Sequence, residues 1–289
     1  NMTAVAILTY NRLQTLKKIL ASAMTHNRVE DMAIFEDCGQ SDGTRQWLTS
    51  TTKKVPRPDL LATEHSLGGG GPKAFLGTDN LGVSGNSNRA LKWFMEETKA
   101  DHLLLCNDDV EFFGDAGNAY SSAHWATNIG LFCFCDFTSQ QYKCTPVTYR
   151  GVQLKKLSRM TGMVMSITRQ LVESIGYFDP QFGRFGEEHC DYTVRARYAG
   201  QQSIMGIHQY CLDIDPQTPV LKHQVVNSTI SIQEKPLLDQ AAGSMMREKS
   251  KRYPFTDPYL GFSLLRNRFT DSMVESGIET DFLLGHTSV

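Results

Sequence analysis

The sequence predicts an α/β fold in which a mostly parallel central sheet is flanked by helices. In the first third of the 289-residue chain, short apolar runs alternate with stretches of helical spacing, the pattern of successive strand–helix–strand units. Polar residues follow several of these runs, as expected where parallel strands end beside a ligand crevice. The composition is globular, since hydrophobic residues make up 40% and charged residues 21% of the chain.

The expected elements can be placed in order from their apolar spacing. Asn11 can cap the first helix, which follows a buried strand (AVAILTY), and the second strand ends at Asp37. A Gly- and Pro-rich segment over residues 55–77 is expected to be a loop. Strands are expected at 4–10, 32–35, 102–107, 129–134, 163–167 and near 203–208, and helices after Asn11, near Thr44, within 80–97, after Thr168 and over 187–199.

Charge and hydropathy exclude several classes of protein. The formal net charge is -2, so no global positive field holds a polyanion. No apolar run approaches the roughly 20 residues of a membrane span, and we expect no transmembrane segment. Seven scattered cysteines, an odd number, indicate reduced thiols, and the first residues lack the pattern of a secretion signal. We therefore expect a cytoplasmic protein.

Polar side chains collect at the expected strand ends. Thr9, Tyr10 and Arg12 follow the first strand, and Asp37 follows the second. Adjacent Asp108 and Asp109 follow a later buried strand, where a divalent cation would relieve their mutual repulsion while holding a diphosphate. A solvated Asp-rich turn is the alternative interpretation of that pair.

The order of several motifs resembles a known family. These motifs are TYNR, Asp37 with SDGT, NLGVSGNSNRAL, LLLCNDD, TGMVMSITRQLVESIGYFD and GEEHCDYTVRARYAG, which together cover residues 4 to 226. The chain is in this respect similar to the family 2 glycosyltransferases, which have the GT-A fold, a Rossmann-like α/β architecture. The resemblance implies an inverting, metal-dependent transferase.

The resemblance also implies roles for individual residues. Asp109 would be a ligand of Mn²⁺ or Mg²⁺, and His223, expected after the sheet, would be the second ligand. Gly82 and Arg89 match the family loop around the nucleotide. The residues implied in nucleotide or donor-sugar binding are Thr9, Tyr10, Arg12, Asp37, Asn80, Asn88, Asp108 and Gly162.

An inverting transfer requires a base that removes the proton of the acceptor hydroxyl. Glu188 and Asp191 lie three residues apart at the start of an expected helix, so they share a face, and both are candidates. The family motif has an acidic residue where this chain has His189, so Glu187 and His189 remain further candidates. For Asp191 the alternative is an ion pair with Arg195, four residues along the helix.

Residues 1–226 are expected to form the catalytic domain and residues 227–289 a helical C-terminal extension. Arg247, Lys249, Lys251 and Arg252 form a basic cluster there that could meet an anionic acceptor or a membrane surface. A solvated helix that packs on the catalytic domain, or on a partner subunit in a homo-oligomer, is the favoured alternative. Localisation would then be cytoplasmic or peripheral to a membrane.

The function implied is transfer of a hexose-type sugar from a nucleoside diphosphate donor, with a UDP-sugar favoured, to a hydroxyl acceptor. A glycan or lipid-linked saccharide is the favoured acceptor, and a modified DNA base or a protein remains open. The main alternative is a catalytically inactive nucleotide-sugar-binding protein of the same fold. A nucleotidyltransferase is a third hypothesis, although TYNR stands where a Gly-rich basic loop would be expected.

Overall fold

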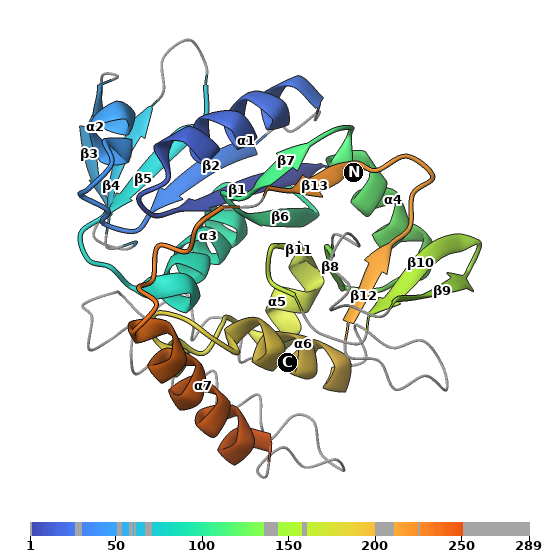
Figure 1. Ribbon diagram of the computed structural model, residues 1–289. Coiled ribbons are helices and arrows are strands. Elements are labelled where there is room, and N and C mark those ends of the chain that lie inside the picture. The colour runs from blue at the N-terminus through green and yellow to red at the C-terminus, as the bar shows by residue number, and fades with distance from the viewer. Residues whose placement is uncertain are drawn as a thin grey trace.

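A computed structural model describes residues 2–26, 31–50, 54–57, 60, 62–66, 71–135, 144–157, 161–199, 211–224 and 226–250. An eight-stranded sheet with the order β3-β4-β5-β2-β1-β6-β11-β8 forms its centre (Figure 1). The strands of this sheet are β1 (Thr3–Thr9), β2 (Asp31–Glu36), β3 (Lys54–Arg57), β4 (Ala62–Ser66), β5 (Lys73–Gly77), β6 (His102–Asn107), β8 (Leu131–Cys133) and β11 (Val164–Thr168). A three-stranded sheet contains β9 (Cys144–Tyr149), β10 (Val152–Leu157) and β12 (Cys211–Ile214), and a two-stranded ribbon pairs β7 (Val110–Phe112) with β13 (Leu221–His223).

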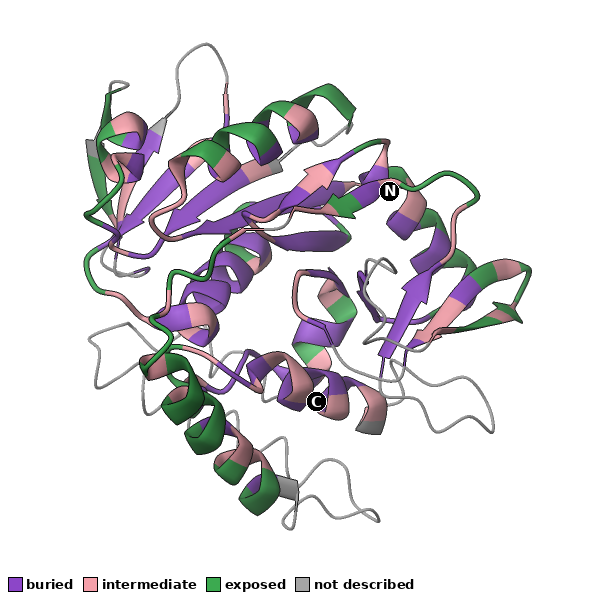
Figure 2. Ribbon diagram, viewed as in Figure 1, coloured by how far each residue is buried: buried purple, intermediate pink, exposed green. Residues whose placement is uncertain are grey.

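Helices cover both faces of the central sheet because its parallel strands are apolar on both sides. Every residue of β1 is buried, and its alternate side chains enter two separate core clusters. One cluster includes residues of α1, and the other includes residues of α3, so the fold has three layers (Figure 2). The helices are α1 (Leu13–His26), α2 (Thr44–Thr49), α3 (Gly82–Glu97), α4 (Ala116–Thr127), α5 (Arg169–Ile175), the 3₁₀ helix η2 (Pro180–Phe182), α6 (Glu188–Tyr198) and α7 (Glu234–Ser250).

The prediction of a loop over residues 55–77 is wrong for most of the residues in this range that the structure describes. Three strands lie there, of which β5 pairs with β2 in parallel and β4 pairs with β5 in antiparallel orientation. Phe75 of β5 stacks on Phe35 of β2 with ring centroids 4.9 Å apart, and this packing overrides the loop-like composition around the strands. Residues 67–70 of the glycine run and the expected strand near 203–208 lie outside the described residues.

The sheet brings three strand ends to one edge. β1 pairs in parallel with both β2 and β6, in a register that places Thr9 opposite Glu36 and Leu8 opposite Asn107. The residues directly after these strands therefore lie at a common rim. The antiparallel β7·β13 ribbon pairs His223 with Val110 and so delivers a residue from far along the chain to the same rim.

The helix α7 lies against the outside of the α/β body, next to α6 (Figure 1). Most of its surface is exposed, but Ala242 and Lys249 are buried. The part of the extension that the structure describes therefore packs on the α/β body, while the domain boundary at residue 226 stays a prediction. Within the described ranges, no helix combines the length and the apolar character required to cross a membrane.

Candidate functional site

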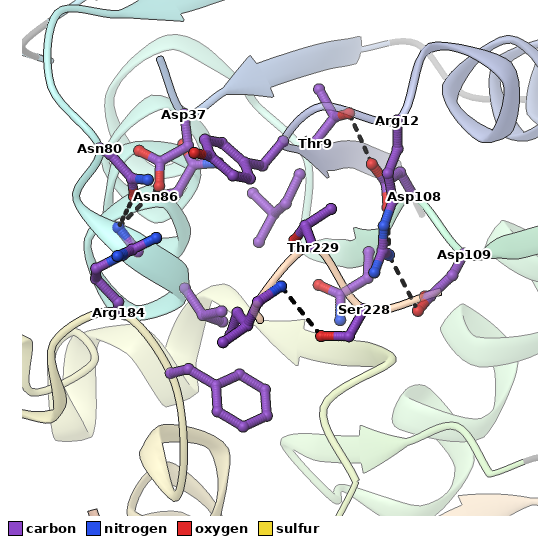
Figure 3. A pocket seen from close by; sticks show the side chains of 17 residues that line it. Thr9, Arg12, Asp37, Asn80, Asn86, Asp108, Asp109, Arg184, Ser228 and Thr229 are labelled. Atoms are coloured by element: carbon purple, nitrogen blue, oxygen red, sulfur yellow. Dashed lines mark hydrogen bonds and ion pairs between the residues drawn. The ribbon is translucent and has the colours of Figure 1, made fainter. Parts of the chain in front are cut away.

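Two neighbouring cavities open at the rim where β1, β2 and β6 end. The first has a volume of about 210 Å³ and the second about 220 Å³, and both are lined by Leu8, Val83, Asn107 and Phe185. In Figure 3, Asp37 and Asn80 lie on one side of the first cavity, and Asp108 and Asp109 lie on the other. The residues that line only the first cavity are Thr9, Tyr10, Arg12, Asp37, Asn80, Gly82, Asn86, Asp108, Asp109, Arg184, Ser228, Thr229 and Ile230.

Asp37 lies on the side of the first cavity where α3 begins, and its hydrogen bonds hold that side in place. Its Oδ1 accepts hydrogen bonds from the Leu81 amide at 2.9 Å and the Arg89 guanidinium at 3.0 Å, and its Oδ2 accepts one from the Gly82 amide at 2.8 Å. Burial raises the pKa of Asp37, and the Arg89 charge opposes this effect. The carboxylate thus joins the end of β2 to the start of α3 while it lines the cavity.

Gly82 allows a very close approach of two segments at this point. Its φ is 70°, in the left-handed region, and a Cβ atom there would lie 2.2 Å from the Cα of Arg184. The Val83 amide also donates to the Arg184 carbonyl at 3.2 Å. Only glycine therefore fits, and the loop before α6 is held against the first turn of α3.

Asp108 is buried opposite Asp37 and is held by residues that follow β1. Its Oδ2 accepts from the Thr9 hydroxyl at 2.7 Å, and its Oδ1 accepts from Arg12 at 3.0 Å. Burial raises the pKa of Asp108 to about 6, although the Arg12 charge opposes the shift. Arg12 also lies 3.5 Å from Asp109 Oδ2 and donates to the Asn227 carbonyl at 3.1 Å. Its guanidinium thereby pairs with both carboxylates and offsets one of their two negative charges.

Asp109 and His223 converge, as the sequence predicts. The distance between Asp109 Oδ2 and His223 Nε2 is 3.8 Å, and the Gln224 amide donates to the Asp109 carbonyl at 2.7 Å. Asp109 Oδ1 is buried without a hydrogen-bond partner. These residues fit a divalent cation, because carboxylate oxygen and imidazole nitrogen are suitable ligands for Mn²⁺.

The residues that the structure describes do not supply a complete coordination sphere for a metal ion. Across the described ranges, no group of three or more His, Cys, Asp and Glu residues is placed to hold a metal ion. A cation that binds through one or two protein ligands usually completes its coordination with substrate phosphate oxygens and water. Asp109 and His223 could therefore supply two protein ligands of such a cation.

The second cavity contains two titratable side chains, both from the start of α6. Glu188 Oε1 accepts from His189 Nδ1 at 3.2 Å. Burial opposes ionisation of Glu188, but the hydrogen bond and charge of His189 outweigh it and lower the pKa of Glu188. Gly162 lines the same cavity, in agreement with its expected place beside a donor sugar. The remaining lining residues are Ser87, Leu105, Thr161, Met163, Met165 and Phe178.

Asp191 lies in a buried ion network and is not among the residues that line either cavity. Its Oδ2 accepts from Arg195 at 2.9 Å, and its Oδ1 accepts from Lys249 of α7 at 2.9 Å. Lys249 also pairs with Asp179. The ion pair with Arg195, considered from helix spacing, is therefore present, and both carboxylate oxygens of Asp191 are occupied.

Asn88 and Arg89 of the third motif have structural contacts. Asn88 exchanges two hydrogen bonds with the backbone of Phe178, and it does not line the first cavity. Asn86 lines the cavity instead, while its amide also donates to the Phe35 carbonyl at 2.9 Å. Asn86 lies four residues after Gly82 in α3, so helical spacing from that glycine could have identified it. No motif marked Ser228, which reaches the cavity only through the tertiary fold.

Comparisons with known proteins bear on the fold. No protein-family model matches the chain. A protein of Acanthamoeba polyphaga mimivirus, named as an uncharacterized glycosyltransferase, is 25% identical over 177 residues. This match covers 60% of the present chain and 65% of the viral protein, so the chain spans just under two thirds of that relative.

Solved structures give a longer alignment. Staphylococcus aureus TarS in complex with UDP aligns with a TM-score of 0.50 at 12% identity, over 98% of this chain and 75% of that chain. A mannosyltransferase from Pyrobaculum calidifontis, in complex with GDP-Man and Mn²⁺, aligns with a TM-score of 0.46 at 14% identity, over 75% and 58% of the two chains. The chain has the GT-A fold, as predicted, and its viral relative is named as a glycosyltransferase.

Proposed function

We propose that this GT-A chain transfers a hexose-type sugar, with inversion, from a nucleoside diphosphate donor to a hydroxyl acceptor. The observation that carries the proposal is the convergence of Asp37, Asp108 and Asp109 around one cavity at the carboxyl ends of three parallel strands. Such a rim is where ligands bind in open α/β sheets. The UDP bound by TarS, on the same fold, supports a UDP-sugar as the favoured donor.

The two sides of the first cavity suit the two halves of a nucleotide. Asp37 and Asn80 can bind the base and ribose, since their oxygens can accept from an imide or a hydroxyl. Arg12 can turn from the carboxylates to a phosphate, with which it forms strong charge-assisted hydrogen bonds. A Mn²⁺ or Mg²⁺ ion held by Asp109 and His223 would offset the charge that develops on the leaving diphosphate.

The sugar and the acceptor would occupy the second cavity. It adjoins the first through Leu8, Val83, Asn107 and Phe185, and Gly162 is part of its wall. Its titratable groups belong to the start of α6, where the sequence places the base. Of the two carboxylates expected there, Glu188 lines this cavity, whereas Asp191 is paired with Lys249 and Arg195.

Release of UDP from a panel of UDP-hexoses in Mn²⁺, with water as the acceptor, tests the proposal. The wild-type chain should bind UDP and release it slowly from at least one donor. The variant Asp109→Asn should lose the Mn²⁺-dependent part of both signals, and Asp239→Asn, on the exposed face of α7, is the matched control. UDP binding without UDP release from any donor would favour the catalytically inactive nucleotide-sugar-binding alternative.

The acceptor is assigned only as a hydroxyl compound. A glycan or lipid-linked saccharide is favoured, and a modified DNA base or a protein remains an alternative, to be separated by an acceptor screen. The cytoplasmic or membrane-peripheral localisation and a homo-oligomer through the C-terminal region remain proposals. The basic cluster considered for an anionic acceptor is described only at Arg247 and Lys249, and Lys249 is buried in the ion network.

A further inference from the structure

His189 is more exposed than Glu188 at the second cavity, in which the acceptor would bind. The side chain of His189 is 25% exposed, whereas that of Glu188 is 7% exposed. Glu188 Oε2 is fully buried without a hydrogen-bond partner. Of the two titratable side chains that line the second cavity, the imidazole is therefore the more accessible to a hydroxyl group.

The hydrogen bond between the two residues defines which ring nitrogen is basic. An ionised carboxylate oxygen can only accept, so the proton between Glu188 Oε1 and His189 Nδ1 belongs to the nitrogen. In the neutral ring, Nε2 then carries the lone pair. This arrangement, with the carboxylate behind the ring, allows the imidazole to take up a proton at Nε2 and stabilises the imidazolium that results.

Gly162 holds the imidazole in place by packing directly against it. A Cβ atom at residue 162 would lie 3.1 Å from both Cβ and Cγ of His189 and 3.3 Å from its Nδ1. The backbone of Gly162 does not lie in the left-handed region, so the requirement for glycine there comes from the space beside the ring. The ring is thus confined between the wall of the cavity and Glu188.

Within the part of the chain that the structure describes, the charged groups around His189 come from its own end of α6. Glu188 and Glu187 both favour the imidazolium. The walls that face the ring from other elements, including Asn107, Thr161 and Ser87, add no titratable side chain to the residues that line this cavity. Burial opposes the charged ring, but the two glutamates outweigh it and raise the pKa of His189.

We propose that His189 is the general base of the transfer and that Glu188 is a positioning residue which orients and polarises it. In the step, the acceptor O–H bond breaks and its proton goes to His189 Nε2. The acceptor oxygen forms a bond to the anomeric carbon, and the bond from that carbon to the phosphate oxygen breaks. The electron pair leaves with the nucleoside diphosphate. This inference rests on the proposed glycosyl transfer.

The pH dependence of turnover distinguishes the imidazole from the carboxylate. UDP release in Mn²⁺, from whichever UDP-hexose the wild-type chain hydrolyses, should rise with pH through a pKa above the ordinary histidine value. His189→Gln should lower kcat by roughly 10²- to 10⁴-fold, the usual contribution of a general base, and should remove that limb of the profile. Glu188→Gln should retain the limb and move it to lower pH. His26→Gln and Glu173→Gln, both at exposed helix positions, are the matched controls.

A second measurement does not depend on activity. In NMR spectra of the full chain, the imidazole signal that His189→Gln removes should titrate above the ordinary pKa and shift downward in Glu188→Gln. UDP binding should be retained in both variants, which separates loss of the base from loss of the fold.

Three results would overturn the inference in recognisable ways. If His189→Gln keeps both its rate and the limb while Glu188→Gln loses them, Glu188 is the base, and glycosyl transfer stands. If Glu188→Gln leaves the titration of the imidazole unchanged, the two side chains do not act as a pair. If the wild-type chain binds UDP but releases none from any donor, the proposed function fails and the base assignment fails with it.

Discussion

Acidification should remove the stability contributed by two buried histidines, His102 and His124, that lie between α4 and the sheet. The Thr3 hydroxyl donates to the Gly117 carbonyl at 3.2 Å and therefore accepts from His102 Nε2 at 2.9 Å. His124 Nδ1 lies 2.6 Å from the Ile129 carbonyl, which can only accept. Both rings are thus satisfied as neutral tautomers.

Protonation would disturb the contacts of His124 in particular. As an imidazolium, both of its nitrogens would donate, and the Ser166 hydroxyl, 2.8 Å from Nε2, would have to reverse its role. The rings of His102 and His124 lie 5.4 Å apart, so the two charges would also repel. Burial lowers the pKa of His102 to about 4 and that of His124 to about 3, the latter also through His102.

These pKa values fix the sign and the size of the contribution that the two histidines make to folding stability. Above about pH 6.5 both histidines are neutral in the folded and unfolded chain, and their full contribution to stability is present. As the pH falls below that value the unfolded chain binds protons first, and stability falls by about 1.4 kcal/mol per pH unit and per histidine until the folded pKa is reached. Between about pH 7 and about pH 5, the loss is about 2 kcal/mol for each ring and about 4 kcal/mol together.

Urea unfolding at a series of pH values measures this loss. In His124→Gln, whose amide can replace both ring contacts, the fall between about pH 7 and about pH 5 should be smaller by about 2 kcal/mol than in the wild type. The exposed His26→Gln should leave the pH dependence unchanged. A His124→Gln curve parallel to the wild-type curve would refute the reasoning, because the buried ring would then not be the group that titrates.

Three further outcomes are expected from single substitutions. Lys249→Met leaves the buried Asp179 and Asp191 without the lysine that they share, so thermal unfolding should show a loss of about 3 kcal/mol in folding stability. The control Arg247→Met, at an exposed position, should show almost no loss. Gly82→Ala forces a Cβ atom onto the backbone of Arg184. Calorimetry should therefore detect weaker UDP binding together with lower stability. Unchanged UDP binding would contradict the close approach of the two segments. For Asp109→Asn, Mn²⁺ should no longer strengthen UDP binding, and if titration with and without Mn²⁺ still differs as in the wild type, Asp109 is not a ligand.

The rim of the sheet could be predicted from the sequence because it depends on local rules. A buried parallel strand followed directly by polar residues places Thr9, Asp37 and Asp108 at one edge, whatever the rest of the fold does. Spacing along α6 likewise indicated the Asp191–Arg195 pair, as the alternative to a catalytic role for Asp191. These positions follow from strand direction and helical period alone.

Contacts between distant segments could not be predicted in the same way. Lys249 reaches Asp191 from 58 residues further along the chain, and no local signal announces that a lysine will be buried. The strands within residues 55–77 depend on the edge that β2 offers and on the stack of Phe75 with Phe35. The close fit of Gly162 against His189 likewise becomes visible only when the two segments meet.

The two strands of the β7·β13 ribbon are far apart in the order of synthesis, so the central sheet can fold before the ribbon is complete. The last strand of the eight-stranded sheet to be synthesised, β11, ends at Thr168, whereas β13 contributes His223 much later. A ribosome-bound chain can therefore complete its central sheet before His223 is available beside Asp109. A nascent or prematurely terminated product would contain the three strand ends of the rim but not His223, and under the proposed function it would lack one of the two protein ligands of the cation.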